Sequence, residues 1–408
     1  MASTQTVKMP NGDTVHLKKS YTIEDTHEYI YTGGAIHFTP DEQYMLTACE
    51  DNVKVSDLNT GKISNIFDGD GEVITCMSLV PNTHTCVVAS RSGQLHHYDY
   101  VDNAVLRTFK SLDGPVASLC WDPSGTLLAT GASNGNVKVW DFAHTAVTHS
   151  FKGSQGIVFS MAFHPDPKRM LLATSASADC DVKVWDLYKK KLVHNMKGHV
   201  SPVQGLVFSD DGKFIVSGGR DKVMNTWRLS DHSFKLHASK PLHESIEGLK
   251  LVPTVNGDTR VKVVTVSDVG KCSVWDAVSG EMLQFSQVHD ALSEVSLLPQ
   301  SHRIVVVNGN MDILFLDQET LTIQRRIIGY NDEIIDAKHI DDDHVLVVAN
   351  SEAARVVQLS THDCAMLEGH TANVLCADIS PCGNYVVTSS KDNTVRVWRK
   401  HQSETEMR

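Results

Sequence analysis

The sequence predicts an all-β fold, a β-propeller built from nine consecutive blade units. A short motif recurs along the chain at intervals of 39 to 48 residues, and each copy ends an apolar run of strand length. Such a period is typical of four-stranded propeller blades. No apolar run reaches the roughly 20 residues that span a membrane, so a bundle of membrane helices is excluded.

The recurring motif is clearest where it ends in a tryptophan and an aspartate. VKVWD ends at Asp141 and again at Asp186, CSVWD ends at Asp276, and MNTWR and VRVWR end at Arg228 and Arg399. Weaker copies are NVKVSD, LHHYD, DILFLD and RVVQLS, which end at Asp57, Asp99, Asp317 and Ser360. This pattern identifies the period as a WD repeat.

One period, residues 198–228, shows why four strands are expected. VQGLVFS is a short apolar strand, DDGK is a turn, and KFIVSGG is a second strand rich in alternating apolar residues. RDK makes the next tight turn and VMNTW the third strand. HSFKLHA, which follows, is more polar and is expected to be the outer strand on the rim.

Five tryptophans close predicted third strands and are expected to pack between neighbouring blades: Trp140, Trp185, Trp227, Trp275 and Trp398. Three of them precede the blade-closing aspartates Asp141, Asp186 and Asp276. A buried indole N–H needs a hydrogen-bond partner. Two blades hold a full polar set at matching spacing, namely His199, Ser217, Asp221 and Trp227, and His370, Thr388, Asp392 and Trp398. The other blades lack members of the set, so we expect them to rely more on apolar packing.

Nine units are more than the seven that usually close one ring. We therefore predict a tail at 1–15, a seven-bladed ring at 16–318, two further blades of a second, incomplete propeller at 319–400 and a polar tail at 401–408. HLKKSYTIEDT at 16–26 is expected to pair onto the seventh blade as its outer strand and close the ring. LTIQRRIIG at 321–329 would begin the second ring. A nine-bladed ring and an open spiral are the alternatives.

Composition and charge limit the classes of function. The formal net charge of −12 argues against binding nucleic acid over the whole surface, although local contacts with RNA are compatible with it. The N-terminus has no secretory signal, which predicts an intracellular protein. The nine cysteines form no CxxC pair and are expected to be free, buried thiols. We predict no cofactor, no metal, no small-molecule substrate and no membrane partner.

Four local motifs could indicate chemistry, and each has a simpler structural interpretation. GASNG at 131–135 matches a nucleophile elbow, but it lies between two strands instead of before a helix. His96 and His97 are adjacent on a strand and point to opposite faces, which does not suit one metal. Lys189–Lys191 is expected to be a solvated turn, with contact to phosphate or an acidic partner as the alternative. Asp341–Asp343 is expected to be a hydrated loop without calcium.

Several longer stretches resemble one family of WD-repeat proteins, the transducin-beta-like 3 family. They are residues 30–63, 114–142, 151–187, 327–340 and 367–399. The most specific is FKGSQGIV…FHPDPKR, at 151–169, because it is not part of the general blade consensus. The resemblance covers the chain from about residue 20 to about residue 400.

The resemblance implies a non-enzymatic scaffold of the UTP-B module of the small-subunit processome in the nucleolus. Its implied partners are other processome WD-repeat proteins, and pre-ribosomal RNA and snoRNA reached indirectly or by local contacts, in the processing that yields 18S RNA. The family pattern has tandem propellers and a C-terminal helical domain, so this chain is expected to correspond to the N-terminal part.

Three other classes of function are weighed against this one. A G-protein-beta-like signalling platform often begins with a coiled coil, and residues 1–19 show no heptads. A ubiquitin-ligase receptor usually carries W-D-x-R, and the arginine is missing after all three Trp-Asp pairs. The third alternative is an enzyme with a propeller fold, and this sequence shows no set of catalytic residues that would support it.

Overall fold

The computed structural model describes residues 4–8, 14–18, 26, 28–111, 113–230, 233–253, 260–288, 290–329 and 333–400. Within these ranges every helix or strand assigned is a β-strand, so the all-β prediction is confirmed. In the same ranges no helix has the length and apolar character needed to cross a membrane.

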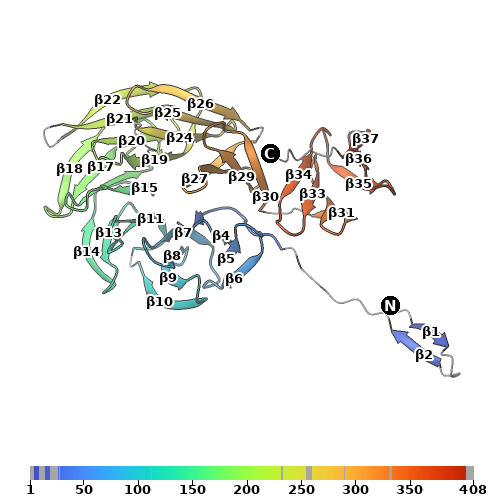
Figure 1. Cartoon of the computed structure of the whole chain (residues 1–408). Coiled ribbons are helices and arrows are strands. Elements are labelled where there is room, and N and C mark those ends of the chain that lie inside the picture. The colour runs from blue at the N-terminus through green and yellow to red at the C-terminus, as the bar shows by residue number, and fades with distance from the viewer. Residues whose placement is uncertain are drawn as a thin grey trace.

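The strands form nine consecutive antiparallel sheets after an N-terminal hairpin (Figure 1). The hairpin is β1 (Thr4–Lys8) and β2 (Thr14–Lys18). The first sheet is β3 (Ile36–Phe38), β4 (Tyr44–Cys49), β5 (Asn52–Asp57) and β6 (Ile63–Phe67). The second is β7 (Ile74–Leu79), β8 (Thr85–Ser90), β9 (Gln94–Asp99) and β10 (Ala104–Lys110). The third is β11 (Val116–Trp121), β12 (Leu127–Ala132), β13 (Val137–Asp141) and β14 (Ala146–Phe151).

The next four sheets repeat this order. The fourth is β15 (Val158–Phe163), β16 (Leu171–Ala176), β17 (Val182–Asp186) and β18 (Lys191–Met196). The fifth is β19 (Val203–Phe208), β20 (Phe214–Gly219), β21 (Val223–Ser230) and β22 (Ser233–Pro241). The sixth is β23 (Ile246–Leu251), β24 (Lys262–Ser267), β25 (Lys271–Asp276) and β26 (Glu281–Gln287). The seventh is β27 (Leu292–Leu298), β28 (Arg303–Asn308), β29 (Asp312–Asp317) and β30 (Ile323–Ile328).

Two sheets follow the first seven. The eighth is β31 (Ile334–Asp341), β32 (His344–Ala349), β33 (Ala354–Gln358) and β34 (Cys364–Leu367). The ninth is β35 (Val374–Ile379), β36 (Tyr385–Ser390) and β37 (Val395–Arg399), and it has three strands among the described residues.

The second strand of each sheet in the ring is buried on both faces. In β20 the residues from Ile215 to Gly219 are all buried, whereas the outer strand β22 is mostly exposed. This difference is expected from the sequence, because FIVSGG consists of apolar and small residues, whereas SFKLHASKP mixes polar and apolar residues. The strands expected from residues 198–228 are therefore observed in place.

The first seven sheets follow one another around a ring (Figure 1), and an apolar cluster lies between each pair of neighbouring sheets. Each of seven clusters combines residues of two adjacent sheets. The cluster that closes the ring packs Ile36 and Met45 of the first sheet against Val305 and Phe315 of the seventh. Burial of such side chains contributes about 1.5–3 kcal/mol each. The stability of one sheet therefore depends on its two neighbours.

We expected residues 16–26 to form the outer strand of the seventh sheet and so close the ring. This expectation is wrong. That place is taken by β30, which pairs with β29 in the register Asp312↔Ile328. Most of residues 16–26 lies outside the described residues. Gly329 completes the closure, because its carbonyl accepts hydrogen bonds from the backbone N–H groups of Ile30 and Tyr31 at 2.8 and 2.9 Å. The stretch 321–329 thus belongs to the seventh sheet and does not begin the eighth. The boundary between the ring and the two further blades, which we expected between residues 318 and 319, therefore lies after residue 329.

The eighth and ninth sheets share a separate core. Leu346, Val348 and Ala354 of the eighth pack against Val374 and Ala377 of the ninth. Among the described residues no apolar cluster joins the seventh sheet to the eighth. The two sheets meet through polar contacts such as the ion pairs of Arg325 with Asp363 and of Arg326 with Glu368.

Candidate interaction surfaces and the polar networks behind them

The first complete polar set comes together in the fifth sheet. The indole N–H of Trp227 donates to the hydroxyl of Ser217 at 3.0 Å, and Nε2 of His199 lies 2.8 Å from the same hydroxyl. Nδ1 of His199 lies 2.9 Å from Oδ2 of Asp221, which also accepts the backbone N–H of Val200. The four side chains thus tie the loop before the inner strand to the second and third strands.

The second set has the same arrangement in the ninth sheet. Trp398 donates to Thr388 at 2.9 Å, Nε2 of His370 lies 2.8 Å from that hydroxyl, and Nδ1 of His370 lies 2.8 Å from Asp392. Burial raises the pKa of the Asp392 carboxyl, but hydrogen bonds from Thr394, His370 and nearby backbone N–H groups outweigh burial and hold the pKa well below its usual range. The carboxylate is therefore ionised at neutral pH.

The other three blade-closing tryptophans keep part of this network. Their indole N–H groups donate to threonines of the second strand: Trp140 to Thr130, Trp185 to Thr174 and Trp275 to Thr265, at 2.9–3.1 Å. These threonines take the place of Ser217 and Thr388. The indole N–H therefore has a hydrogen-bond partner in all five sheets, although the histidine is missing in three.

Lysines of the third strand partly replace the missing histidines, which the sequence reasoning did not foresee. Lys138 and Lys183 stand two residues before Trp140 and Trp185, as Asn225 stands before Trp227. Lys183 Nζ donates to the Gly153 carbonyl and the Asp179 carboxylate. Lys138, Lys183 and, in the first sheet, Lys54 all have side chains no more than 12 % exposed. We expected the blades that lack members of the polar set to rely more on apolar packing. That expectation is incomplete, because these lysines supply polar contacts of their own.

The aspartates after the tryptophans cap the turn between third and outer strands. Oδ1 of Asp141 accepts the backbone N–H groups of Ala143 and His144, and Asp276 accepts that of Val278 in the same way. Oδ1 of Asp186 accepts the backbone N–H of Lys189 at 2.9 Å. An aspartate side chain commonly fixes a turn in this manner. We infer a structural role for these carboxylates.

The motifs that could indicate chemistry take structural positions. Ser133 of GASNG lies in the turn between β12 and β13, with no helix after it. His97 is buried against the ring of Phe142 at 4.8 Å. Asp341 contacts His344 next to its own turn, and Asp343 accepts a hydrogen bond from Ser360 in the turn between β33 and β34. Among the described residues no group of three or more His, Cys, Asp and Glu side chains could hold a metal.

A hollow of 470 Å³ lies at one end of the ring, where inner strands of several sheets meet. Phe38, Trp121 and Phe163 contribute apolar surface, and Lys250 is its lining cation. Burial, followed by the charge of Lys250, lowers the pKa of His37 to about 4, so this lining imidazole is neutral. The hollow can receive an apolar side chain with a carboxylate beside it.

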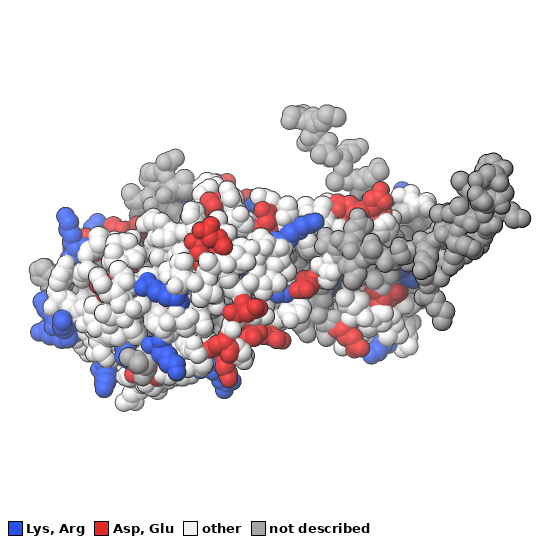
Figure 2. Space-filling model, turned by 90° about the horizontal axis from the view of Figure 1, so that it is seen from below, with Lys and Arg blue, Asp and Glu red and all other residues white. Residues whose placement is uncertain are grey.

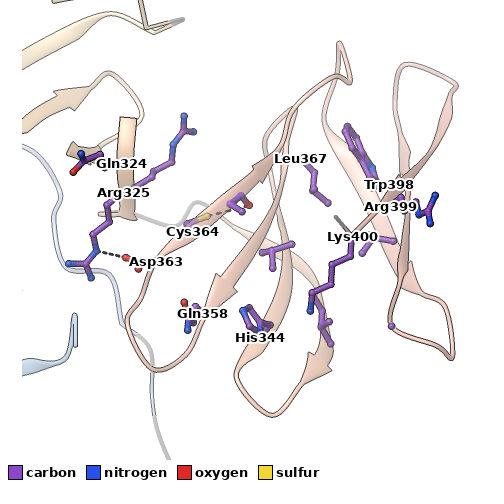
Figure 3. Close-up of a pocket in the computed structure, with 16 residues that line it drawn as sticks. Gln324, Arg325, His344, Gln358, Asp363, Cys364, Leu367, Trp398, Arg399 and Lys400 are labelled. Atoms are coloured by element: carbon purple, nitrogen blue, oxygen red, sulfur yellow. Dashed lines mark hydrogen bonds and ion pairs between the residues drawn. The ribbon is translucent and has the colours of Figure 1, made fainter. Parts of the chain in front are cut away.

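A second hollow, of 430 Å³, is lined by the outer strands β30 and β34 of the seventh and eighth sheets, by residues of β31 to β33, and by residues of β36 and β37 in the ninth sheet. Figure 3 shows Arg325 reaching Asp363 on one side, with Leu367, Trp398 and Lys400 around the space on the other. The adjacent face of the ninth sheet is open, since Val395 and Val397 are each 65 % exposed. This end of the chain thus presents an apolar surface that no described residue covers.

The WD domain, G-beta repeat family model matches residues 104–141, 145–186, 190–228 and 362–399. Each match begins near the outer strand of one sheet and ends near the close of the third strand of the next. Transducin beta-like protein 3 of Bos taurus is 33 % identical over 400 residues, which cover 95 % of this chain and 50 % of that relative. The human protein of that name is 32 % identical over 401 residues, 95 % of this chain and 49 % of the relative.

A more distant relative is the U3 small nucleolar RNA-associated protein 13 of Saccharomyces cerevisiae. It is 26 % identical over 410 residues, which cover 92 % of this chain and 50 % of the relative. The chain thus spans about half the length of the curated relatives it matches.

Repeated four-stranded sheets, tryptophan-closed third strands and matching repeats define a WD-repeat β-propeller protein. Within that class, nearly the whole chain is similar to transducin beta-like protein 3 of four mammals, at 31–33 % identity.

Proposed function

We propose that this chain is a non-enzymatic scaffold in ribosome biogenesis that acts in the small-subunit processome on the precursor of 18S RNA. The observation that carries the proposal is the match of 92–95 % of the chain to transducin beta-like protein 3 and to a protein named for its association with U3 small nucleolar RNA. The site supports it, because the polar sets and tryptophans stabilise the sheets and leave the turns free for contacts.

We also propose that the first seven sheets are one propeller and that the eighth and ninth belong to a second. Two observations favour this division over a nine-bladed ring. The apolar cluster between the first and seventh sheets closes the ring without the last two. The last two have their own core and meet the seventh through polar contacts. The open face around Val395 and Val397 is where a further sheet of the second ring would pack.

The proposed setting is the nucleolus, with other WD-repeat proteins of a multi-subunit complex as partners. RNA would be reached through those partners or by local contacts, because the overall charge of −12 opposes contact over the whole surface. No cofactor, small-molecule substrate or membrane is part of the proposal.

Affinity purification tests the assignment. In this experiment the chain is expressed with an affinity tag in cells of its source organism. The captured proteins are then quantified by mass spectrometry and compared with those from an untagged strain. Enrichment of processome WD-repeat proteins together with U3 small nucleolar RNA is expected. Enrichment of cullin-ligase subunits or heterotrimeric G-protein subunits instead would favour an adaptor or signalling platform and reject the processome role.

A further inference from the structure

One face of the ring carries an unusual concentration of positive charge at the fourth and fifth sheets. The turn before β16 and the turn after β17 lie together, because Leu171 pairs with Asp186. The equivalent turns of the fifth sheet lie together for the same reason, since Phe214 pairs with Arg228. We call Tyr188 and the exposed cationic residues of these turns and of the strand ends beside them the rim patch: Lys168, Arg169, Tyr188, Lys189, Lys190, Lys191, Lys213, Arg228 and Lys235.

The charge of the rim patch contrasts with that of the corresponding turns in the first three sheets. It has eight cationic side chains, and four carboxylates lie in the described parts of the same turns: Asp166, Asp186, Asp210 and Asp211. Asp231, between β21 and β22 in the sequence, lies outside the described residues. The corresponding turns of the first three sheets carry Asp41, Glu42, Asp57, Asp99, Asp102, Asp122 and Asp141, with Lys62 as their cation. Figure 2 shows Lys and Arg gathered at the left-hand end of the molecule, the end that holds β17 and β18 in Figure 1.

Most of these cations are available to a ligand. Lys189 pairs with Asp186 at 3.1 Å and Lys213 with Asp211 at 3.0 Å. Among the described residues Arg169, Lys190 and Lys191 form no ion pair. A cavity of 500 Å³ between the fourth and fifth sheets runs beside them; its lining includes Arg169, Lys189, Lys191 and His194. The charges therefore flank a groove and are not scattered over a convex surface.

An exposed aromatic ring lies in the same turn. Tyr188 directly precedes the three lysines and is 68 % exposed. Its side chain makes no hydrogen bond or ring contact with another residue of the described chain. A ring held in solvent beside a row of cations offers stacking to a base while the cations neutralise phosphates.

We infer that the rim patch is a binding site for single-stranded RNA, with Arg169 and Lys189–Lys191 on the phosphates and Tyr188 stacked on a base. The inference rests on the proposed function only for the RNA that the site would meet in the cell. An acidic protein segment would use the cations as well, but it would gain little from the tyrosine ring, so the aromatic side chain favours RNA.

The experiment measures binding of a fluorescent oligouridylate to the purified chain by anisotropy, between about 50 and 200 mM salt. The test variant combines Arg169→Gln, Lys189→Gln, Lys190→Gln and Lys191→Gln. The control combines Arg91→Gln, Lys110→Gln, Lys152→Gln and Lys197→Gln, which remove the same charge from exposed positions on the opposite face. We expect the test variant to bind at least about tenfold more weakly and its salt slope to fall by about 3, since each phosphate contact on a single strand contributes about 0.7.

Tyr188 separates RNA from an acidic protein as the ligand. Tyr188→Ala should weaken binding by about 5- to 100-fold without changing the salt slope, and Tyr188→Phe should bind like the parent. Equal losses in the test and control variants, or no binding by the parent at low salt, would overturn the inference. So would unchanged binding by Tyr188→Ala together with equal competition by polyglutamate, which would assign the patch to an acidic protein. The assay uses purified protein, so its failure is distinct from a failure to co-purify with the processome.

Discussion

Nζ of Lys138 lies 2.8 Å from Oδ2 of Asp113 in the third sheet, and it also donates to the carbonyl of Ser111. In the fifth sheet Asn225 stands at the equivalent position, donates to the carbonyl of Gly198 and contacts His199. A lysine and a carboxylate thus join the third strand to the preceding loop where the histidine is missing. The ring is held by two kinds of polar network, one centred on histidine and one on lysine.

Breaking the lysine network should destabilise the ring. Lys138→Met leaves Asp113 without its cation in a site that is mostly buried, and we expect a loss of about 1–3 kcal/mol in the free energy of unfolding. Chemical denaturation checks this, with the exposed Lys110→Met as the matched control at about 0.5 kcal/mol or less. If Lys138→Met unfolds at the denaturant concentration of the control, the ion pair contributes nothing.

The stability lost when a blade-closing tryptophan is replaced by alanine should depend on how closely its neighbours cover it. Trp227 is 4 % exposed between the fourth and fifth sheets, so Trp227→Ala should cost about 3–5 kcal/mol. Trp398 closes the ninth sheet, faces the hollow beside the eighth sheet and is only partly buried. Trp398→Ala should therefore cost less. Thermal unfolding followed by calorimetry compares the two, and equal losses would contradict the looser packing around Trp398.

Asp221 supports His199, and its removal should cost less than removal of Trp227. Asp221→Ala takes away the acceptor of Nδ1 of His199, whose side chain is fully buried. An unsatisfied buried group of this kind costs about 1–3 kcal/mol. Denaturation in urea measures the loss. A variant as stable as the parent would show that the hydrogen bond between the two side chains does not stabilise the sheet.

The stability of the ring should fall in mild acid because of a buried histidine. Burial, aided by the charge of Arg107, lowers the pKa of His97 to about 4. In the unfolded chain the imidazole takes up a proton below about pH 6.5, while in the folded chain it stays neutral until about pH 4. Stability from this group is therefore present above about pH 6.5 and is lost as the pH falls, by up to about 1.4 kcal/mol per pH unit.

His97→Phe removes that titration and keeps a ring against Phe142. We expect the dependence of unfolding free energy on pH to become shallower by up to one proton between about pH 6.5 and 4. Urea denaturation across this range provides the comparison. Parallel curves for parent and variant would mean that His97 is protonated in the folded chain.

The repeat made most of the fold predictable, because strand length, turn residues and a closing tryptophan recur at a fixed interval. The members of both full polar sets could be named for the same reason, since their spacing is constant. The lysine networks could not, because VKV is an ordinary strand sequence and Lys138 meets Asp113 only through the fold. The closure of the ring was misplaced because residues 16–26 and 321–329 both have the pattern of an outer strand, and pattern alone does not show which one pairs with β29.

The most direct test of the central claim is the processing of ribosomal RNA after depletion of this protein, with a resistant copy of the gene as rescue. Northern hybridisation measures the precursor of the small-subunit RNA against the precursor of the large-subunit RNA. A scaffold of the small-subunit processome predicts that the unprocessed small-subunit precursor accumulates, that mature 18S RNA falls and that the rescue copy restores both. Normal levels of the precursor and of 18S RNA after efficient depletion would contradict the account.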